Sequence, residues 1–363
     1  MMKKRILALM LCLALGLSLA ACAPKDNGEQ TVSPSPDATP SQSVTPDAQP
    51  ASDEPGEPTT VRFAVLSGPT GVGAVKLLAD NDAGESLGTY DVTLAADNQE
   101  IGAKLMNGDL DIACMASNVA ATLYNKNQGG IQALCLSTLG VLYILERGEK
   151  GFTPTVTNLG DLRGQTIYAT GQGANPEYVL NYLLTENGVD PENDVEIVWQ
   201  TAEEVQAALL TGDARFAMLP VPAATAAQIK AKQTEDREVV SALDLTEEWD
   251  KVTSDGVLTM TTVVVRTEFA QEHPEAVEAF LKDYQASIEY VNGSVEDAAA
   301  LVEQYGIVPQ AAIAKLAIPD CNLVYIAGEE MRDQIQGYYR VLYEANPASV
   351  GGGLPDDGFY YIP

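Results

Sequence analysis

The sequence predicts an α/β protein with two lobes, and three observations support this. Between Val61 and Ala231, short runs rich in β-branched and apolar residues alternate with segments that have helical apolar spacing. This alternation is typical of βαβ units and a mostly parallel sheet. Glycine, proline and capping residues stand at many of the boundaries. After Val257 the pattern changes to one strand followed by long helices, which indicates a second lobe inserted into the first.

The pattern predicts each element by its residue range. The expected strands are Val61–Leu66, Asp91–Ala96, Asp111–Met115, Ile131–Ser137, Val141–Arg147, Gln165–Thr170, Val195–Gln200, Arg215–Leu219 and Val257–Arg266. The expected helices are Val72–Ala79, Gln99–Asn107, Val119–Asn125, Pro176–Asn187, Ala202–Thr211, Ala223–Ala231, Glu268–Val291, Val295–Tyr305, Pro309–Leu316 and Glu329–Ala345. Asn175 before Pro176 is typical of a helix N-terminus with Asn as the cap. Thr201 and Glu204 have the spacing of a capping box.

Two crossings between the lobes are expected. The first lobe then comprises residues 60–149 and 256–363, and the second lobe comprises residues 150–255. The last part of the first lobe carries the C-terminal helices. Three glycines at 351–353 let a short tail turn back, so that Phe359, Tyr360 and Tyr361 dock on the body.

The composition excludes several classes of function. The chain has 363 residues, with 51 Asp and Glu against 21 Lys and Arg, a net charge of −30. Nucleic acid and anionic membrane surfaces both require a basic face, so neither is an expected partner. The single histidine, His273, excludes zinc sites with two histidines. It precedes a proline at an expected exposed helix start, where no reactive group with a base beside it is expected. We expect no enzymatic activity, no metal and no cofactor.

The first residues have the features of a secretion signal. Lys3, Lys4 and Arg5 precede the apolar run Ile6–Leu19, which is too short to span a membrane comfortably. The residues that end at Cys22, Leu-Ala-Ala-Cys, resemble a bacterial lipobox. We therefore expect residues 1–22 to be a lipoprotein signal peptide and Cys22 to carry the acyl chains. The alternative is an ordinary signal with a chance cysteine.

Residues 23–59 are rich in Pro, Ser and Thr and poor in aromatic and branched apolar residues. Such a segment cannot bury a core, so it is expected to be a disordered tether. A lipid anchor followed by a tether would hold the folded body at the outer face of the cell membrane. Two acyl chains are sufficient for stable anchoring, and no other membrane contact is expected.

Three cysteines remain in the body, Cys114, Cys135 and Cys321. Cys114 and Cys135 lie in expected strands, where a small apolar-like side chain suits a core. Buried free thiols are therefore the expectation, and a Cys114–Cys135 disulfide is the alternative. Because three is an odd number, a complete disulfide framework is excluded.

Ligands of open parallel sheets bind beyond the carboxyl ends of the strands, where helix N-termini begin. The turn after the first strand is glycine-rich. Gly68 and Gly73 have the spacing of a P-loop that binds phosphate, but Ala74 stands where that motif requires a lysine. This excludes a P-loop site for a nucleoside triphosphate. What remains is a turn that exposes backbone N–H groups, with a simple tight turn as the alternative. Its candidate ligand-binding residues are Ser67, Gly68, Pro69, Thr70 and Gly71.

A second candidate turn follows the strand that ends near Thr170. Gly171 and Gly173 begin a dinucleotide-binding pattern, but Pro176 replaces its third glycine. We expect this turn to face a ligand as the helix N-terminus of the second lobe. Its candidates are Thr170, Gly171, Gln172, Gly173 and Asn175. Other strand ends add Asn118, Thr138, Trp199, Pro220 and Pro222, of which Trp199 could equally be a core residue.

The candidate turns contain no Lys or Arg. Helix N-termini alone can hold an anion, but the acidic chain works against the approach of one. These residues favour a small polar solute, neutral, zwitterionic or heterocyclic, over an inorganic anion.

With signal, tether and lobes considered together, the chain resembles bacterial ABC-transporter substrate-binding lipoproteins of the SsuA-like, sulfonate-, nitrate- and thiamine-precursor-binding family. The segments that carry the resemblance are Lys104–Ala113, Asn158–Tyr168, Val205–Asp213 with Ala217–Pro222, and Val263–Glu275. The resemblance implies a type II periplasmic-binding-protein fold: two Rossmann-like lobes, a two-crossing hinge and a cleft that closes on a solute. It implies a monomer that works with an ABC permease and an ATPase.

Residues 67–71, Asn118 and residues 170–175 match places where members of this family contact ligand. The absence of a cationic side chain there argues against a sulfonate or nitrate. Related thiamine-pyrimidine synthases use a cysteine-rich motif and a histidine, and neither arrangement is present here. Two alternatives to solute uptake remain: a solute-sensing receptor that partners a signalling protein, and a surface enzyme.

Overall fold

The computed structural model describes residues 59–234 and 236–362, which belong to one compact unit, residues 55–363. The expected signal peptide with Cys22, and the expected tether up to residue 58, lie outside the described residues. Among the helices that are described, none combines the length and the apolar character needed to cross a membrane.

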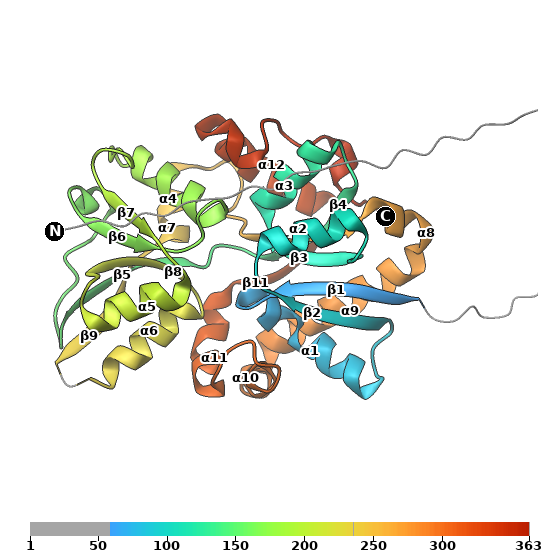
Figure 1. The fold of residues 1–363 in the computed structure, drawn as a ribbon, viewed down its shortest axis with the longest axis horizontal. Helices are drawn as coiled ribbons and strands as arrows, with labels where there is room; N and C mark the ends of the chain where they lie inside the picture. The colour runs from blue at the N-terminus through green and yellow to red at the C-terminus, as the bar shows by residue number, and fades with distance from the viewer. Residues whose placement is uncertain (1–58, 235, 363) are drawn as a thin grey trace, which may run out of the picture. The chain divides into compact units, whose positions relative to one another are not determined.

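The first sheet of the described chain has six strands in the spatial order β11-β4-β10-β3-β1-β2 (Figure 1). They are β1 (Thr60–Leu66), β2 (Thr89–Ala95), β3 (Ile112–Ala116), β4 (Ile131–Thr138), β10 (Thr261–Arg266) and β11 (Leu323–Ala327). β1 is parallel to β2 and β3, whereas β10 is antiparallel to both β3 and β4. The sheet is therefore mixed rather than mostly parallel, because β10 enters it from the opposite end after the chain returns.

Helices cover both faces of the first sheet. The apolar cluster that contains Phe63 also contains residues of α1 (Pro69–Ala83) and α9 (Pro274–Gly293). The cluster on the other face, which contains Ala64, includes residues of three further helices: α2 (Asn98–Asn107), α3 (Ser117–Asn127) and α12 (Gly328–Ala345). Side chains alternate between the faces of a strand, so strands buried on both faces appear in the sequence as continuous apolar runs.

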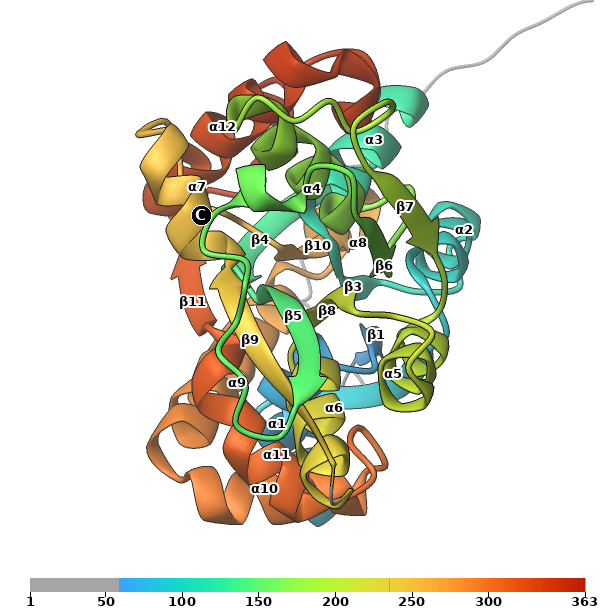
Figure 2. The ribbon, with the colours of Figure 1, turned by 90° about the vertical axis from the view of Figure 1, so that its left-hand side faces the viewer.

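The second sheet has the order β7-β6-β8-β5-β9 (Figure 2). Its strands are β5 (Leu142–Glu149), β6 (Thr166–Ala169), β7 (Glu196–Trp199), β8 (Phe216–Pro220) and β9 (Arg237–Asp244). Its helices are α4 (Asn175–Glu186), α5 (Ala202–Thr211), α6 (Ala223–Lys232) and α7 (Leu245–Val252). The apolar residues of α5 and α6 cluster with Leu219, and those of α4 and α7 cluster with Met218, so helices again cover both faces.

The chain passes between the sheets twice. β5 pairs with β8 and β9, so the first passage lies before β5, at residues 139–141, and not at the expected boundary after residue 149. A Cβ atom on Gly140 would lie 2.1 Å from Thr246 Oγ1, so this passage requires a glycine. The second passage, between α7 and β10, contains the expected boundary at residue 255. Apolar runs on both sides of Gly140 hide the first passage in the sequence.

Most expected elements are confirmed, with shifted ends, and the Thr201–Glu204 capping box is formed. Of the described strands and α-helices, β9, α7 and β11 were not predicted, and the strand expected from Val257 begins only at Thr261. The long helix expected from residue 268 is two helices, α8 (Thr267–Glu272) and α9. His273 separates them because the proline that follows disfavours helical backbone at that residue. The first-sheet body also contains α10 (Val295–Gln304) and α11 (Ala311–Ala317).

The C-terminal tail docks on the body, as predicted. Phe359 and Tyr360 are buried, and the backbone N–H of Tyr361 donates a hydrogen bond of 2.9 Å to the carbonyl of Ala133 on β4. Tyr361 itself is only half-buried.

The three body cysteines are free and buried, which confirms the expectation of free thiols. Cys114 on β3 and Cys135 on β4 both pair with Val263 of β10, which lies between them. Strands are about 4.8 Å apart, so the two Cα atoms are about 10 Å apart, too far for a disulfide. Burial raises the pKa of the Cys114 thiol to about 12, so this thiol is unreactive.

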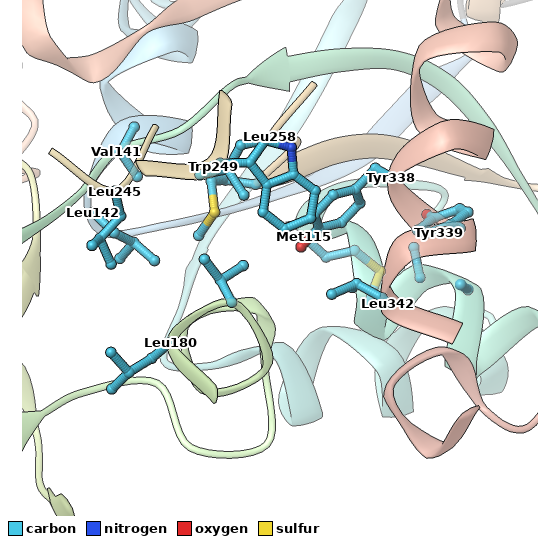
Figure 3. Packing of buried hydrophobic residues seen from close by; sticks show 14 of the residues in the cluster. Met115, Val141, Leu142, Leu180, Leu245, Trp249, Leu258, Tyr338, Tyr339 and Leu342 are labelled. Atoms are coloured by element: carbon cyan, nitrogen blue, oxygen red, sulfur yellow. The ribbon is translucent and has the colours of Figure 1, made fainter. Parts of the chain in front are cut away.

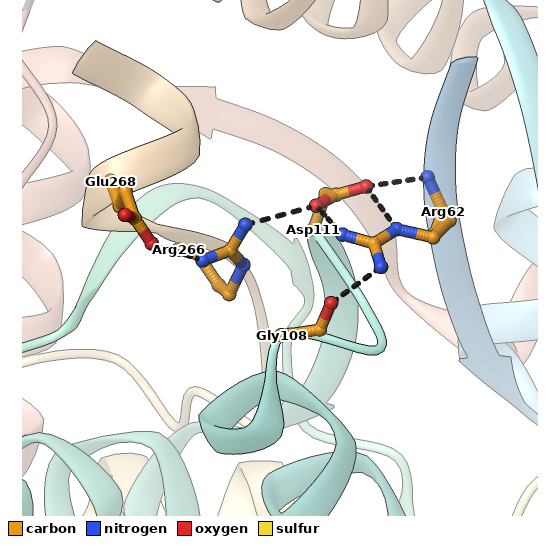
Figure 4. A network of polar contacts seen from close by, with 5 residues as sticks. All are labelled: Arg62, Gly108, Asp111, Arg266 and Glu268. Carbon is orange, nitrogen blue, oxygen red and sulfur yellow. Dashed lines mark hydrogen bonds and ion pairs between the residues drawn. The ribbon is translucent and has the colours of Figure 1, made fainter. Parts of the chain in front are cut away.

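A buried carboxylate joins three strands of the first sheet (Figure 4). Asp111 accepts hydrogen bonds from Nε of Arg62 at 2.8 Å and from the Arg62 backbone N–H at 3.0 Å, and Arg266 of β10 lies 3.4 Å away. Burial by itself would raise the pKa of Asp111, but the hydrogen bonds and charges of the two arginines hold it below its usual range. Arg62 and Asp111 stand at the amino ends of β1 and β3, so this cluster positions the strands without occupying the ends that face the candidate site.

Candidate functional site

The turn from β1 into α1 leaves a helix N-terminus open. Gly68 adopts a φ of +109° at the N-cap, and α1 has neither a side-chain cap nor an acidic residue in its first turn. The Thr70 hydroxyl donates to the carbonyl of Leu66 at 3.0 Å and accepts from its N–H at 3.1 Å, so it is used within the turn. Ser67 is exposed. Within the described chain, the N–H groups of Thr70 and Gly71 therefore have no hydrogen-bond acceptor, and both residues are buried at the positive end of the helix dipole.

Gly71 fixes the position of this turn by close packing. A Cβ atom there would lie 2.9 Å from the Leu66 carbonyl oxygen and 3.0 Å from Cγ2 of Ile307. A larger residue would have to move the helix away from the strand that precedes it. The glycine at this position allows close approach rather than an unusual backbone angle, whereas Gly68 provides the positive φ.

The N-termini of α3 and α4 meet at Asn175, which is fully buried. Its Oδ1 accepts from the backbone N–H of Asn118 at 3.3 Å and from the hydroxyl of Tyr338 at 2.9 Å. Its Nδ2 donates to Oγ of Ser117 at 2.9 Å and to the carbonyl of Met260. The whole amide is therefore paired inside the protein, and it joins α4 of the second-sheet body to elements of the first-sheet body.

Asn175 is consequently not the N-cap that the sequence suggested. The N-cap of α4 is Ala174, and the Asn175 amide bonds across to the neighbouring elements instead. The sequence identified Asn118 and Asn175, and the structure brings them together. It did not identify Ser117, which precedes Asn118. It also did not identify Tyr338, because this residue is 163 positions from Asn175 in the chain. The amphipathic pattern of α12 indicates only that Tyr338 is a core residue.

Asn118 is also buried and is mostly used for packing. Its Nδ2 donates to the carbonyl of Ser349 at 3.1 Å, and no described residue pairs with its Oδ1. The adjacent Ser117 carbonyl accepts from the hydroxyl of Tyr339 at 2.7 Å. α12 and the segment after it thus hold the N-terminus of α3 in place.

An apolar cluster continues this contact between the two bodies (Figure 3). The ring centroid of Trp249, on α7, lies 5.4 Å from the ring centroid of Tyr338 on α12 and 5.2 Å from that of Tyr182 on α4. Met115 at the end of β3 and Leu180 of α4 belong to the same cluster. This closely packed side joins the two bodies, and it is called the hinge side below.

The rest of the turn after β6 is more open. Gly171 and Gly173 have φ values of +89° and +78°. The N–H of Gly173 donates to Oε2 of Glu177 at 2.6 Å, so a carboxylate already occupies one donor at this helix N-terminus. The side chains of Thr170 and Gln172 form no hydrogen bond with any described residue, and Gln172 is exposed. These two side chains are available to a ligand.

The remaining candidate residues are either buried within the protein or half-buried at strand ends. The Thr138 hydroxyl is buried and bonds to the hydroxyl of Thr261. Trp199 ends β7 half-buried against the core, and Pro220 ends β8 half-buried. Pro222 is buried at the N-cap of α6. In the described part of the chain, no group of three or more His, Cys, Asp or Glu side chains is arranged to hold a metal ion.

The comparisons with known proteins agree on one family. A family described as "ABC transporter, phosphonate, periplasmic substrate-binding protein" matches residues 86–314, more than half of the chain. A search of curated proteins found no match.

Solved structures show the same fold. A crystal structure of an ABC transporter protein from Parabacteroides distasonis is 25% identical, with a TM-score of 0.68, and the match covers 84% of this chain and 99% of that one. The aliphatic sulphonate binding protein SsuA of Escherichia coli (14% identity, TM-score 0.65, 84% and 93% covered) has the same fold. The MOPS-bound alkanesulfonate-binding protein SsuA of Xanthomonas axonopodis pv. citri also has this fold (11% identity, TM-score 0.61, with 83% of this chain and 96% of that one covered). The chain belongs to the phosphonate-type family of periplasmic substrate-binding proteins of ABC transporters, with the expected periplasmic-binding-protein fold.

Proposed function

We propose that this protein captures a small polar solute between its two sheets, closes on it and delivers it to an ABC permease, without catalysing a reaction. The open N-terminus of α1 carries this proposal. It follows β1 directly, it has no acidic residue in its first turn, and Ser67 beside it is exposed. β1 runs toward the second sheet, so this turn faces the second body (Figure 1).

The solute is neutral or zwitterionic rather than an inorganic anion. The available side chains are the hydroxyl groups of Ser67 and Thr170 and the amide of Gln172, and none carries a positive charge. A helix N-terminus can hold the acidic end of a zwitterion, because its N–H groups and dipole replace a basic side chain. An aminoalkylphosphonate is a zwitterion, so the family description is compatible with this class.

Thermal unfolding of residues 55–363 tests the proposal. The chain is heated alone and with aminoalkylphosphonates, alkylsulfonates, inorganic phosphate, nitrate, amino acids, aminopyrimidines and polyamines. A solute at 100 times its dissociation constant stabilises the fold by about 2.7 kcal/mol, which raises the midpoint by a few degrees. We expect a zwitterionic or neutral compound to give the largest shift. A larger shift with phosphate or nitrate would contradict the proposed solute class.

We further propose that Cys22 anchors the chain to the outer face of the cell membrane through its acyl chains. Its support is the basic and apolar signal pattern before Cys22. Cells that express the chain are labelled with a radioactive fatty acid. The wild type is expected to incorporate label and to sediment with membranes, and Cys22→Ser is expected to do neither. Co-purification of a permease from those membranes tests delivery.

A further inference from the structure

A separate cavity lies between α4 and α12, on the hinge side of the molecule. Its volume is about 560 Å³, enough for a small organic molecule. Tyr178 and Tyr182 of α4 and Val341 and Leu342 of α12 supply aromatic and apolar lining. Both views show α4 and α12 close together (Figures 1 and 2). The residues that line the cavity include none of those proposed above to bind the transported solute.

The charges around this cavity all have one sign. Glu186, Glu192, Asp255 and Glu344 line it, and no Lys, Arg or His does. Only Asp255 has a basic partner among the described residues, since it lies 2.6 Å from Arg340. The other three carboxylates are exposed at the rim. The cavity therefore combines an aromatic and partly apolar wall with a negative rim.

Tyr182 lies within the electrostatic field of two of these carboxylates. Burial and the charges of Glu186 and Glu344 raise the pKa of Tyr182 above its usual value. Its ring also packs on Trp249 at 5.2 Å, which holds the tyrosine in place at the cavity wall. Aromatic faces next to carboxylates attract organic cations, because the ring and the carboxylates both interact with the positive charge. The ring also covers the apolar part of such a ligand.

A divalent metal ion fits this cavity less well than an organic cation. A metal requires several oxygen or nitrogen ligands around one point. No group of three or more such side chains is close enough among the described residues, and the carboxylates are instead distributed around the rim. A ligand that reaches from the apolar lining to one of these carboxylates needs both a hydrophobic part and a charged end.

We propose that the cavity between α4 and α12 binds a primary organic ammonium ion with an apolar substituent, at a site distinct from that of the transported solute. The apolar part lies against Tyr178, Tyr182 and Leu342. The ammonium group lies at the rim near Glu186 and Glu344. Because α4 and α12 belong to the two bodies, a ligand at this site contacts both sides of the hinge.

Isothermal titration of the full chain in detergent with 2-phenylethylamine tests the proposal, with 2-phenylethanol as its neutral counterpart. We expect saturable binding of the amine and at least tenfold weaker binding of the alcohol. In the double variant Glu186→Gln/Glu344→Gln, amine affinity is expected to fall at least fivefold. The matched control Glu203→Gln/Glu303→Gln removes the same charge from exposed positions on α5 and α10, and should retain the wild-type affinity.

A second variant locates the ligand without changing the charge. Ala345 is exposed and lines the cavity at the end of α12, so Ala345→Trp fills the space with little risk to the fold. We expect it to abolish amine binding while the thermal midpoint stays close to that of the wild type. Equal binding of amine and alcohol, an equal loss in the control double variant, unchanged binding in Ala345→Trp, or the absence of saturable binding would each overturn the proposal.

Discussion

Two glycine-rich turns lead from a strand into a helix, one after β1 and one after β6. Both have a proline in the first turn of the helix, and both contain a residue that can cap a helix. In the first turn, Thr70 bonds back to its own strand and the N–H groups of the helix stay open. In the second, Asn175 bonds to the other body and Glu177 takes a backbone donor. The first turn therefore keeps the donors that we propose for the solute, whereas the second turn mainly joins the two bodies.

The largest expected effect distinguishes Asn175 from its exposed neighbour. Asn175→Ala leaves the Tyr338 hydroxyl and the Asn118 N–H buried without a partner, so we expect a loss of about 3 kcal/mol in the free energy of unfolding. Urea unfolding measures this. The control Gln172→Ala should change stability by less than about 0.5 kcal/mol. Similar values for both variants would mean that Asn175 does not hold the hinge.

The next prediction compares Gly71, which allows close packing, with Gly173, which provides a positive φ. Gly71→Ala places a Cβ atom 2.9 Å from the Leu66 carbonyl oxygen, so we expect a loss of about 1–3 kcal/mol and a displaced α1. Gly173→Ala meets no atom within 4 Å and has only its positive φ to oppose it, which costs about 1 kcal/mol. Thermal unfolding of both variants makes the comparison. If Gly173→Ala were the more damaging, close packing would not be what fixes the first turn.

A smaller effect is expected for the two threonines. Thr70→Val removes a hydroxyl with two backbone bonds, and we expect the free energy of unfolding to fall by about 1 kcal/mol. Thr170 has no such bond within the described chain, so Thr170→Val should leave stability almost unchanged. If Thr170 instead meets the solute, this second variant weakens solute binding alone. Stability and affinity measured together on both variants separate the two roles.

The smallest effect on stability has the clearest consequence for binding. Ser67→Asp puts a carboxylate at the open N-terminus of α1, which should stabilise the free protein by about 0.3–1 kcal/mol through the helix dipole. The same carboxylate competes with the solute, so affinity should fall at least tenfold. Gln172→Glu adds a charge to the turn where Glu177 is already bound, and its effect on affinity should be smaller. Calorimetry with the solute found by thermal unfolding measures both, and equal losses would remove the distinction between the turns.

The sequence alone predicted most of the strands and helices, because apolar periodicity and capping residues are local signals. It missed the edge strands β9 and β11. β11 is the five-residue apolar run Leu-Val-Tyr-Ile-Ala, and periodicity alone does not distinguish so short a run from a buried helical segment. It placed the first passage between the sheets too late, since Gly140 is a single residue between two apolar runs. The break at His273 was readable from Pro274 in the sequence.

For the site, local patterns determined where a ligand could bind: at glycine-rich turns and strand ends without basic side chains. The acidic charge, the family resemblance and the expectation of a signal and a tether also came from the sequence. Only the tertiary structure decided which of the polar residues are available. Asn118, Thr138 and Asn175 are used by Ser349, Thr261 and Tyr338, which lie far along the chain. Ser67, Thr170 and Gln172 have no such partner among the residues that the structure describes. No spacing in the sequence separates these two groups, because hydrogen bonds between distant segments depend on the packing of the helices that carry them.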